Sequence, residues 1–178
     1  MLTWKTFEQN IVTHSAAHHL MTISQLLKQN GYARVSDVAR KLDITRGSAS
    51  ITLKALKEKG FVREDENKFL RLSEEGGRIS HSIQSKRMIL IKFMQDVLQV
   101  EAEQAESDAC KIEHLISSET GEKLLQFLKF LFSNELKAKA FLNAYWSYEN
   151  KCLGLVEECG VCETECLVQE EKNGSKSK

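Results

Sequence analysis

A turn of only three residues, Asp43 to Thr45, separates two short helical patterns and limits most strongly what this chain can fold into. The first pattern covers residues 35–42, starts at Ser36 and repeats apolar residues at helical spacing. The second covers residues 46–59, with Thr45 as its N-cap and Gly60 at its end. Because so short a link makes two helices cross steeply, the chain is predicted to contain a helix-turn-helix.

The segments on either side extend this unit. A helical stretch, residues 4–29, precedes it and ends at Gly31, with Thr13 or Ser15 as the cap of a second segment if the stretch breaks. Two strand-like runs follow, residues 61–63 and 69–72, joined by a polar turn. Helix, helix, turn, helix and hairpin is the order of a winged helix-turn-helix. We therefore expect residues 1–75 to form a DNA-binding domain.

The second half of the chain, residues 76–150, is predicted to be all-helical, so the fold class is mainly α. Helical patterns follow Ser73, cover residues 101–116, follow Ser118 and cover residues 135–148. Residues 88–132 carry more apolar helix faces than one small bundle can bury. This surplus predicts a helical dimerisation domain and a homodimer. Residues 151–178 form a separate cysteine-rich tail.

Composition excludes several classes of protein. The formal net charge is zero, but residues 1–75 hold twelve Lys and Arg against nine Asp and Glu, which weakly favours an anionic partner for that half. No apolar run approaches the roughly 18 residues that cross a bilayer. Because no secretory signal pattern begins the sequence either, we expect a cytoplasmic protein without a membrane partner. In that setting the five cysteines are predicted to be reduced thiols or metal ligands.

One short segment, residues 108–114, carries the side chains of a metal site. Cys110, Glu113 and His114 follow one another at i, i+3 and i+4, which places them on one face of a helix and outside the core. A thiolate, a carboxylate and an imidazole together suit a divalent transition metal. The same pattern also fits a small buried cysteine beside a surface Glu–His pair. A thiol nucleophile assisted by His114 lacks an orienting third group, so we do not expect an enzyme.

Three segments of this chain resemble the diphtheria toxin repressor family of iron- and manganese-dependent transcriptional regulators. Residues 108–114 resemble the family's metal-site helix, residues 31–39 the start of its second helix, and Leu72-Ser73-x-x-Gly76 the exit from its wing. The resemblance implies a winged helix followed by a dimerisation and metal-binding domain. It also implies double-stranded DNA with a palindromic operator as partner, Fe2+ (or Mn2+ or another divalent metal) as cofactor, and repression of metal-uptake genes.

The resemblance also implies the ligands. The principal site would comprise Cys110, Glu113, His114 and a residue of the first helix, here His18, where relatives have methionine or aspartate. His14 and Met21, one turn away on either side, are alternative donors.

A second, ancillary site of the family is expected to be missing. The histidine and glutamate that build it are replaced here by Arg87 and Ile91, and arginine does not ligate metals. We expect Arg87 to pair with Asp108 or with a nearby glutamate. A single-metal site, or some metal-independent activity, follows.

The four remaining cysteines cluster in the tail, where a CxxC pair lies among four thiols, a pattern typical of metal ligands. The spacing matches neither a regular zinc ribbon nor the bacterial ferredoxin pattern. Because the rest of the chain resembles an iron sensor, a 4Fe–4S cluster is slightly favoured over structural Zn2+, and free thiols are the third interpretation. An alternative function is therefore a redox-sensing or iron–sulfur-sensing regulator on the same scaffold, with a vestigial helix site. The cysteines are Cys152, Cys159, Cys162 and Cys166.

The helix after Thr45 is expected to enter the major groove by its N-terminal end, while the hairpin reaches phosphates or the minor groove. Small hydroxyl residues dominate the helix, so specificity is expected to depend partly on DNA shape. The predicted DNA-contacting residues are Thr45, Arg46, Ser48, Ser50, Thr52, Arg63 and Lys68.

Overall fold

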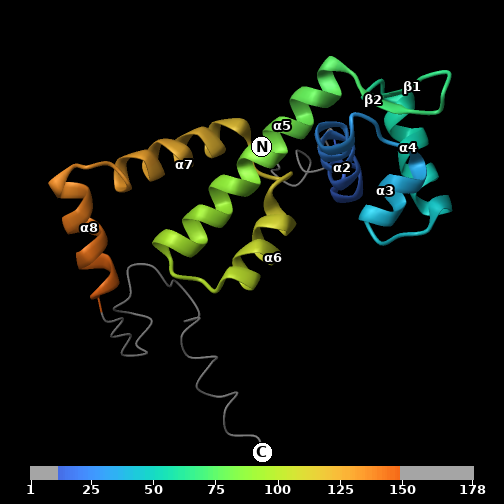
Figure 1. Cartoon of the computed structure of the whole chain (residues 1–178). Helices are drawn as coiled ribbons and strands as arrows, with labels where there is room; N and C mark the ends of the chain where they lie inside the picture. The colour runs from blue at the N-terminus through green and yellow to red at the C-terminus, as the bar shows by residue number, and fades with distance from the viewer. Residues whose placement is uncertain (1–11, 149–178) are drawn as a thin grey trace, which may run out of the picture. The chain divides into compact units, whose positions relative to one another are not determined.

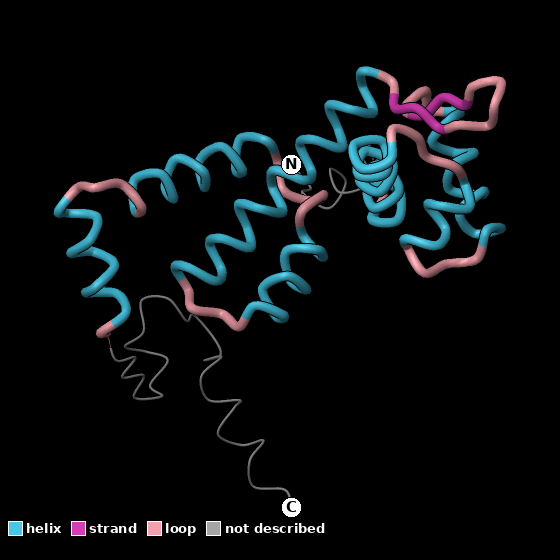
Figure 2. Tube along the Cα trace, in the orientation of Figure 1, coloured by secondary structure: helices cyan, strands magenta, loops and turns pink. Residues whose placement is uncertain are grey.

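The computed structural model describes residues 12–148, whose regular elements are all helices apart from one β-hairpin (Figures 1 and 2). The chain divides into two compact units, Met1–Ser133 and Asn134–Lys178. The elements of the first unit are α2 (His14–Asn30), α3 (Val35–Lys41), α4 (Arg46–Glu58), β1 (Val62–Glu64), β2 (Leu70–Leu72), α5 (Glu74–Lys92), a π-helical turn (Phe93–Val97), α6 (Ala102–Ile112) and α7 (Ser118–Leu131). The second unit contains α8 (Leu136–Trp146).

Local sequence signals set the helix ends in the first half. The Thr13 hydroxyl accepts a hydrogen bond from the backbone amide of Ala16 at the start of α2. Thr45 caps α4 in the same way, with its Oγ1 3.1 Å from the backbone nitrogen of Ser48. Gly31 ends α2 with a φ of +76°, a left-handed conformation that glycine adopts without steric cost. The predicted start of α3 at Ser36 is wrong. That helix begins at Val35, because the Asp37 carboxylate accepts the Arg34 amide at 3.2 Å.

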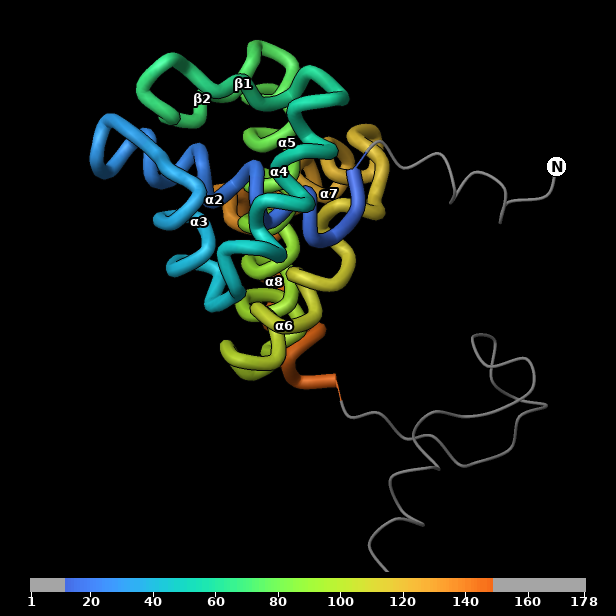
Figure 3. The backbone as a smooth tube through the Cα atoms, turned by 90° about the vertical axis from the view of Figure 1, so that its right-hand side faces the viewer, coloured from blue at the N-terminus to red at the C-terminus, as the bar shows by residue number. Residues whose placement is uncertain are grey.

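The winged helix-turn-helix has one apolar core. Leu20 and Ile23 of α2 pack with Leu53 and Leu56 of α4, and Leu70 of the hairpin completes the cluster. The two strands pair antiparallel with Val62 opposite Leu72. In Figure 3 the hairpin lies beyond the C-terminal end of α4, in the position of a wing. The predicted order of elements is therefore present.

A close backbone approach joins the hairpin to α5. The Ser73 hydroxyl caps α5 by accepting the Gly76 amide at 3.0 Å. A Cβ at Gly76 would lie 2.1 Å from the Phe61 carbonyl oxygen, so only glycine fits there. The Leu72-Ser73-x-x-Gly76 pattern thus fixes the angle at which α5 leaves the wing.

Beyond the wing, α5 is the central helix of the first unit. It packs against α2, α6 and α7, and it ends in the π-helical turn. The predicted helix over residues 101–116 is shorter than expected, since α6 ends at Ile112 and Glu113 is its C-cap. Several large apolar side chains between residues 88 and 132 are exposed, namely Met88, Leu98, Leu125, Phe127, Phe130 and Phe132.

The described part of the chain leaves two predictions open. The division into domains at residues 75 and 150 stays a prediction, and so does the cysteine tail, which lies outside the described residues. Among the described helices, none is both long and apolar enough to cross a membrane.

Candidate metal centre

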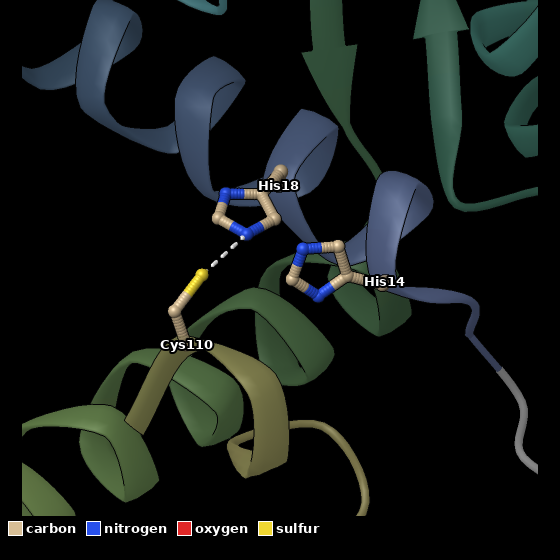
Figure 4. A group of neighbouring side chains, drawn as sticks. All are labelled: His14, His18 and Cys110. Carbon is tan, nitrogen blue, oxygen red and sulfur yellow. Dashed lines mark hydrogen bonds between the residues drawn. The ribbon is translucent and has the colours of Figure 1, made fainter. Parts of the chain in front are cut away.

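The first turns of α2 and the end of α6 bring together, beside α5, side chains of types that can ligate a metal. His18 Nε2 of α2 lies 3.2 Å from Cys110 Sγ of α6, as Figure 4 shows, and 4.0 Å from Glu113 Oε1. These residues are 92 and 95 positions apart in the sequence. The structure thus gathers three of the four side chains that the sequence assigned to the principal site.

His14 belongs to the same cluster. Its ring centroid is 4.5 Å from that of His18 and 5.1 Å from that of His114. One donor atom from each of His14, His18 and Cys110 lies within 4.8 Å of the other two. Figure 4 shows these three side chains, which come from two helices. Sequence reasoning treated His14 as a substitute for His18, whereas the i, i+4 spacing places both at the cluster.

Glu113 is the most deeply buried member. Its side chain has no solvent exposure, so the prediction that it lies outside the core is wrong. One carboxylate oxygen, Oε2, accepts a hydrogen bond from Arg87 at 3.2 Å, while Oε1 faces His18. The expected partner of Arg87 is therefore a glutamate and not Asp108, which is bonded instead to Gln104 and Lys111.

Burial sets the protonation states of the cluster. It lowers the pKa of His18 to about 4, and the nearby side chains of His14 and Arg87 act in the same direction. It also lowers the pKa of His114, and it raises the pKa of Glu113 against the opposing effect of Arg87. Both imidazoles are therefore neutral at neutral pH, the form in which histidine binds metals.

Two buried polar atoms of the cluster have no hydrogen-bond partner among the described residues, Glu113 Oε1 and His114 Nδ1. Leaving such an atom unsatisfied costs about 1–3 kcal/mol, so buried polar atoms nearly always have a partner. A divalent ion would be a partner for these atoms, because imidazole, thiolate and carboxylate groups bind such ions at about 2.0–2.3 Å. The residues present therefore fit a divalent transition metal.

The predicted DNA-contacting residues of α4 divide into two groups. Ser50 donates its hydroxyl proton to the Arg46 carbonyl, Thr45 caps the helix, and half-buried Thr52 lies 3.5 Å from the Ser15 hydroxyl of α2. These hydroxyls have partners inside the protein. Arg46 and Ser48 have exposed side chains at the N-terminal end.

The hairpin is less basic than the sequence indicated. Glu64 pairs with Lys57 at 2.6 Å and with Lys68 at 3.6 Å. Hydrogen bonding to Lys57 accordingly holds the pKa of Glu64 below its ordinary value. Arg63 remains exposed on β1, and it is the better placed of the two predicted wing contacts.

Comparison with known proteins gives a consistent result. Residues 73–137 match the family described as iron dependent repressor, metal binding and dimerisation domain. The HTH-type transcriptional regulator MntR of Lysinibacillus sphaericus (strain C3-41) is 25% identical over 122 residues, which is 68% of this chain and 87% of that protein. The iron-dependent repressor IdeR of Mycobacterium bovis (strain ATCC BAA-935 / AF2122/97) is 23% identical over 119 residues, which is 67% of this chain and 52% of that protein.

Among solved structures, the manganese regulator SloR has the same fold, with a TM-score of 0.59 and 22% identity. The match covers 64% of this chain and 53% of SloR. The chain therefore spans about half the length of SloR and of the mycobacterial repressor, and most of MntR. The predicted mainly helical fold is confirmed.

Proposed function

We propose that this chain, which belongs to the diphtheria toxin repressor family, is a DNA-binding transcriptional regulator controlled by a divalent metal, with Fe2+ as the physiological ion. The single observation that carries the proposal is the convergence of His18 on Cys110 at 3.2 Å. The two side chains come from the winged helix and from the helical half, which supports a shared site for them. The relatives named as a transcriptional regulator and as an iron-dependent repressor support a role in repression, and the genes that we propose it represses are those for metal uptake.

The proposed ligands are His18, Cys110, Glu113 and His114, with His14 as a further donor. A bound divalent ion would supply Lewis acidity that holds these neutral and anionic groups together. Nitrogen and sulfur donors outnumber the carboxylate, a set that favours iron, cobalt, nickel or zinc over manganese. Arg87 contributes positive charge. Burial lowers the pKa of its guanidinium, but the hydrogen bonds to Cys110 and Glu113 and their charges outweigh this effect and raise the pKa overall, so the group stays charged.

The first turn of α2 connects the proposed site to the DNA-binding helix. His14 lies in the cluster, and the hydroxyl of the next residue, Ser15, is 3.5 Å from that of Thr52 on α4. Ligands that hold α2 against α6 therefore also fix α4 relative to the rest of the unit. In a homodimer this would set the spacing of two recognition helices for a palindromic operator.

The proposed dimer surface is a groove between α5 and α7 lined by apolar side chains, which are exposed or half-buried except for buried Leu128. Lys92 and Lys129 flank it, and the matched family domain is described as one for dimerisation. The apolar side chains that line it are Met88, Ile89, Ile91, Leu125, Leu128 and Phe132.

A metal titration of the full chain tests the site. Anaerobic Fe2+ binding and Co2+ absorbance are measured on the native protein and on His18→Gln, with exposed His81→Gln of α5 as the matched control. We expect His18→Gln to weaken binding at least about ten-fold, as loss of a supporting group around a metal does, and His81→Gln to leave it unchanged. Equal metal affinities in all three proteins, or a DNA affinity that is the same with and without the metal, would contradict the proposal.

We further propose that Cys152, Cys159, Cys162 and Cys166 bind one cofactor per chain, a 4Fe–4S cluster or a Zn2+ ion. Four thiols in a short segment supply the ligands of either group. Anaerobic purification followed by metal analysis separates them. About four irons per chain with a brown colour support the cluster, and one zinc in a colourless protein supports the ion. Four freely alkylated thiols would remove the tail site.

A further inference from the structure

The outer face of α4 carries one large aliphatic side chain that the fold does not use. Ile51 is 74% exposed, although burial of an isoleucine is worth about 1.5–3 kcal/mol. The other large apolar residue exposed in described residues 12–75 is Tyr32, which packs on Phe69. The buried stripe of α4, by contrast, comprises Ala49, Leu53 and Leu56.

The neighbours of Ile51 leave room for a partner. Gly47 lies one turn before it, and a Cβ built there would meet only the Thr45 hydroxyl, at 3.9 Å. Exposed Ala55 lies one turn after it. Gly47 and Ala55 are therefore small neighbours on either side of Ile51, so a flat partner can approach the helix backbone closely there.

Charge indicates which partner fits. Arg46 begins the helix, and Lys54 lies one turn beyond Ile51. The Lys54 side chain is 79% exposed and forms a long, exposed ion pair with Glu58 at 4.0 Å, which leaves the ammonium accessible to a partner. Cations at both ends of an apolar centre suit a nucleic acid, where phosphates surround base edges. In the major groove the one apolar group on a base edge is the 5-methyl of thymine.

We propose that Ile51 contacts the 5-methyl group of a thymine in the major groove and thereby sets the base preference at one position of each operator half-site. The inference rests on the proposed DNA-binding function. Ser50 cannot compete for this role, because its hydroxyl donates to the Arg46 carbonyl at 2.8 Å. Ile51 is thus a specificity-determining residue that the sequence analysis did not select, since an exposed isoleucine cannot be distinguished from a buried one by residue type.

Substitution of thymine by uracil removes only that methyl group. The full metal-loaded protein first selects binding sites from a random duplex library, and fluorescence anisotropy then compares each thymine with uracil. We expect uracil at one position per half-site to weaken native binding about four-fold, as the loss of one buried methyl implies. Ile51→Ala should bind both duplexes equally. Because the side chain is exposed, that variant should keep the native melting temperature.

Lys54→Ala is the matched control on the same helix. It should weaken binding to the thymine and uracil duplexes equally and reduce the salt slope by about one. Uracil that is harmless at every position, or that weakens Ile51→Ala as much as the native protein, overturns the inference while DNA binding stands. A protein that enriches no duplex overturns both the inference and the proposed function.

Discussion

The ion pair between Arg87 and Glu113 provides a sharp test of how the site is built. The 3.2 Å separation corresponds to an attraction of about 5 kcal/mol at an effective dielectric constant of about 20. Burial of the two groups opposes this attraction, and it does so unequally. The Glu113 side chain has no exposure, whereas the Arg87 side chain is 26% exposed and can reach solvent.

The two single substitutions should therefore differ. Arg87→Met leaves a carboxylate buried without a cation and should lower the free energy of unfolding by about 3–5 kcal/mol. Glu113→Met leaves a guanidinium that reaches water, so we expect a loss of about half that size. The double variant places two apolar side chains together, and it should lie within about 1 kcal/mol of the native protein.

Urea unfolding of the metal-free protein, followed by circular dichroism with a chelator present, measures all four proteins. The m-value should stay constant, which shows that the same surface unfolds in each. The reasoning fails if the two single effects add to the double effect within about 0.5 kcal/mol, because additivity of that kind marks residues that do not interact. A larger loss in Glu113→Met than in Arg87→Met would also contradict it.

Three further predictions concern the scaffold. Gly76→Ala should destabilise the protein by at least about 2 kcal/mol, because its Cβ would overlap the Phe61 carbonyl. In thermal melts Gly77→Ala, which meets no atom within 4 Å, should be neutral or stabilising, and equal effects would refute the close approach. Thr45→Ala should cost about 1 kcal/mol through loss of the α4 cap; an unchanged unfolding midpoint would contradict this. Light scattering should find a dimer that Met88→Glu weakens; a monomeric native protein, with and without metal, would refute the dimer.

The sequence by itself determined the order of elements in the first half, because the signals there are local. Thr45 and Ser73 bond to amides three residues away, and Gly31 needs only its own φ of +76°. Such contacts depend on neighbouring residues and little else, so they can be recognised without a tertiary structure. The Cys110, Glu113 and His114 spacing is also local, since the three residues lie at the end of α6 and just beyond it, and it was recognised for the same reason.

Tertiary packing decided what these signals could not. His14 and Cys110 are 96 positions apart in the sequence, so whether His14 joins the cluster depends on where α2 packs against α6. The burial of Glu113 follows from α5, which supplies Arg87 and covers the end of α6. The exposure of Ile51 likewise depends on which face of α4 packs against the core. A side chain's burial, and with it its charge state and availability to a ligand, is set by the helices packed around it.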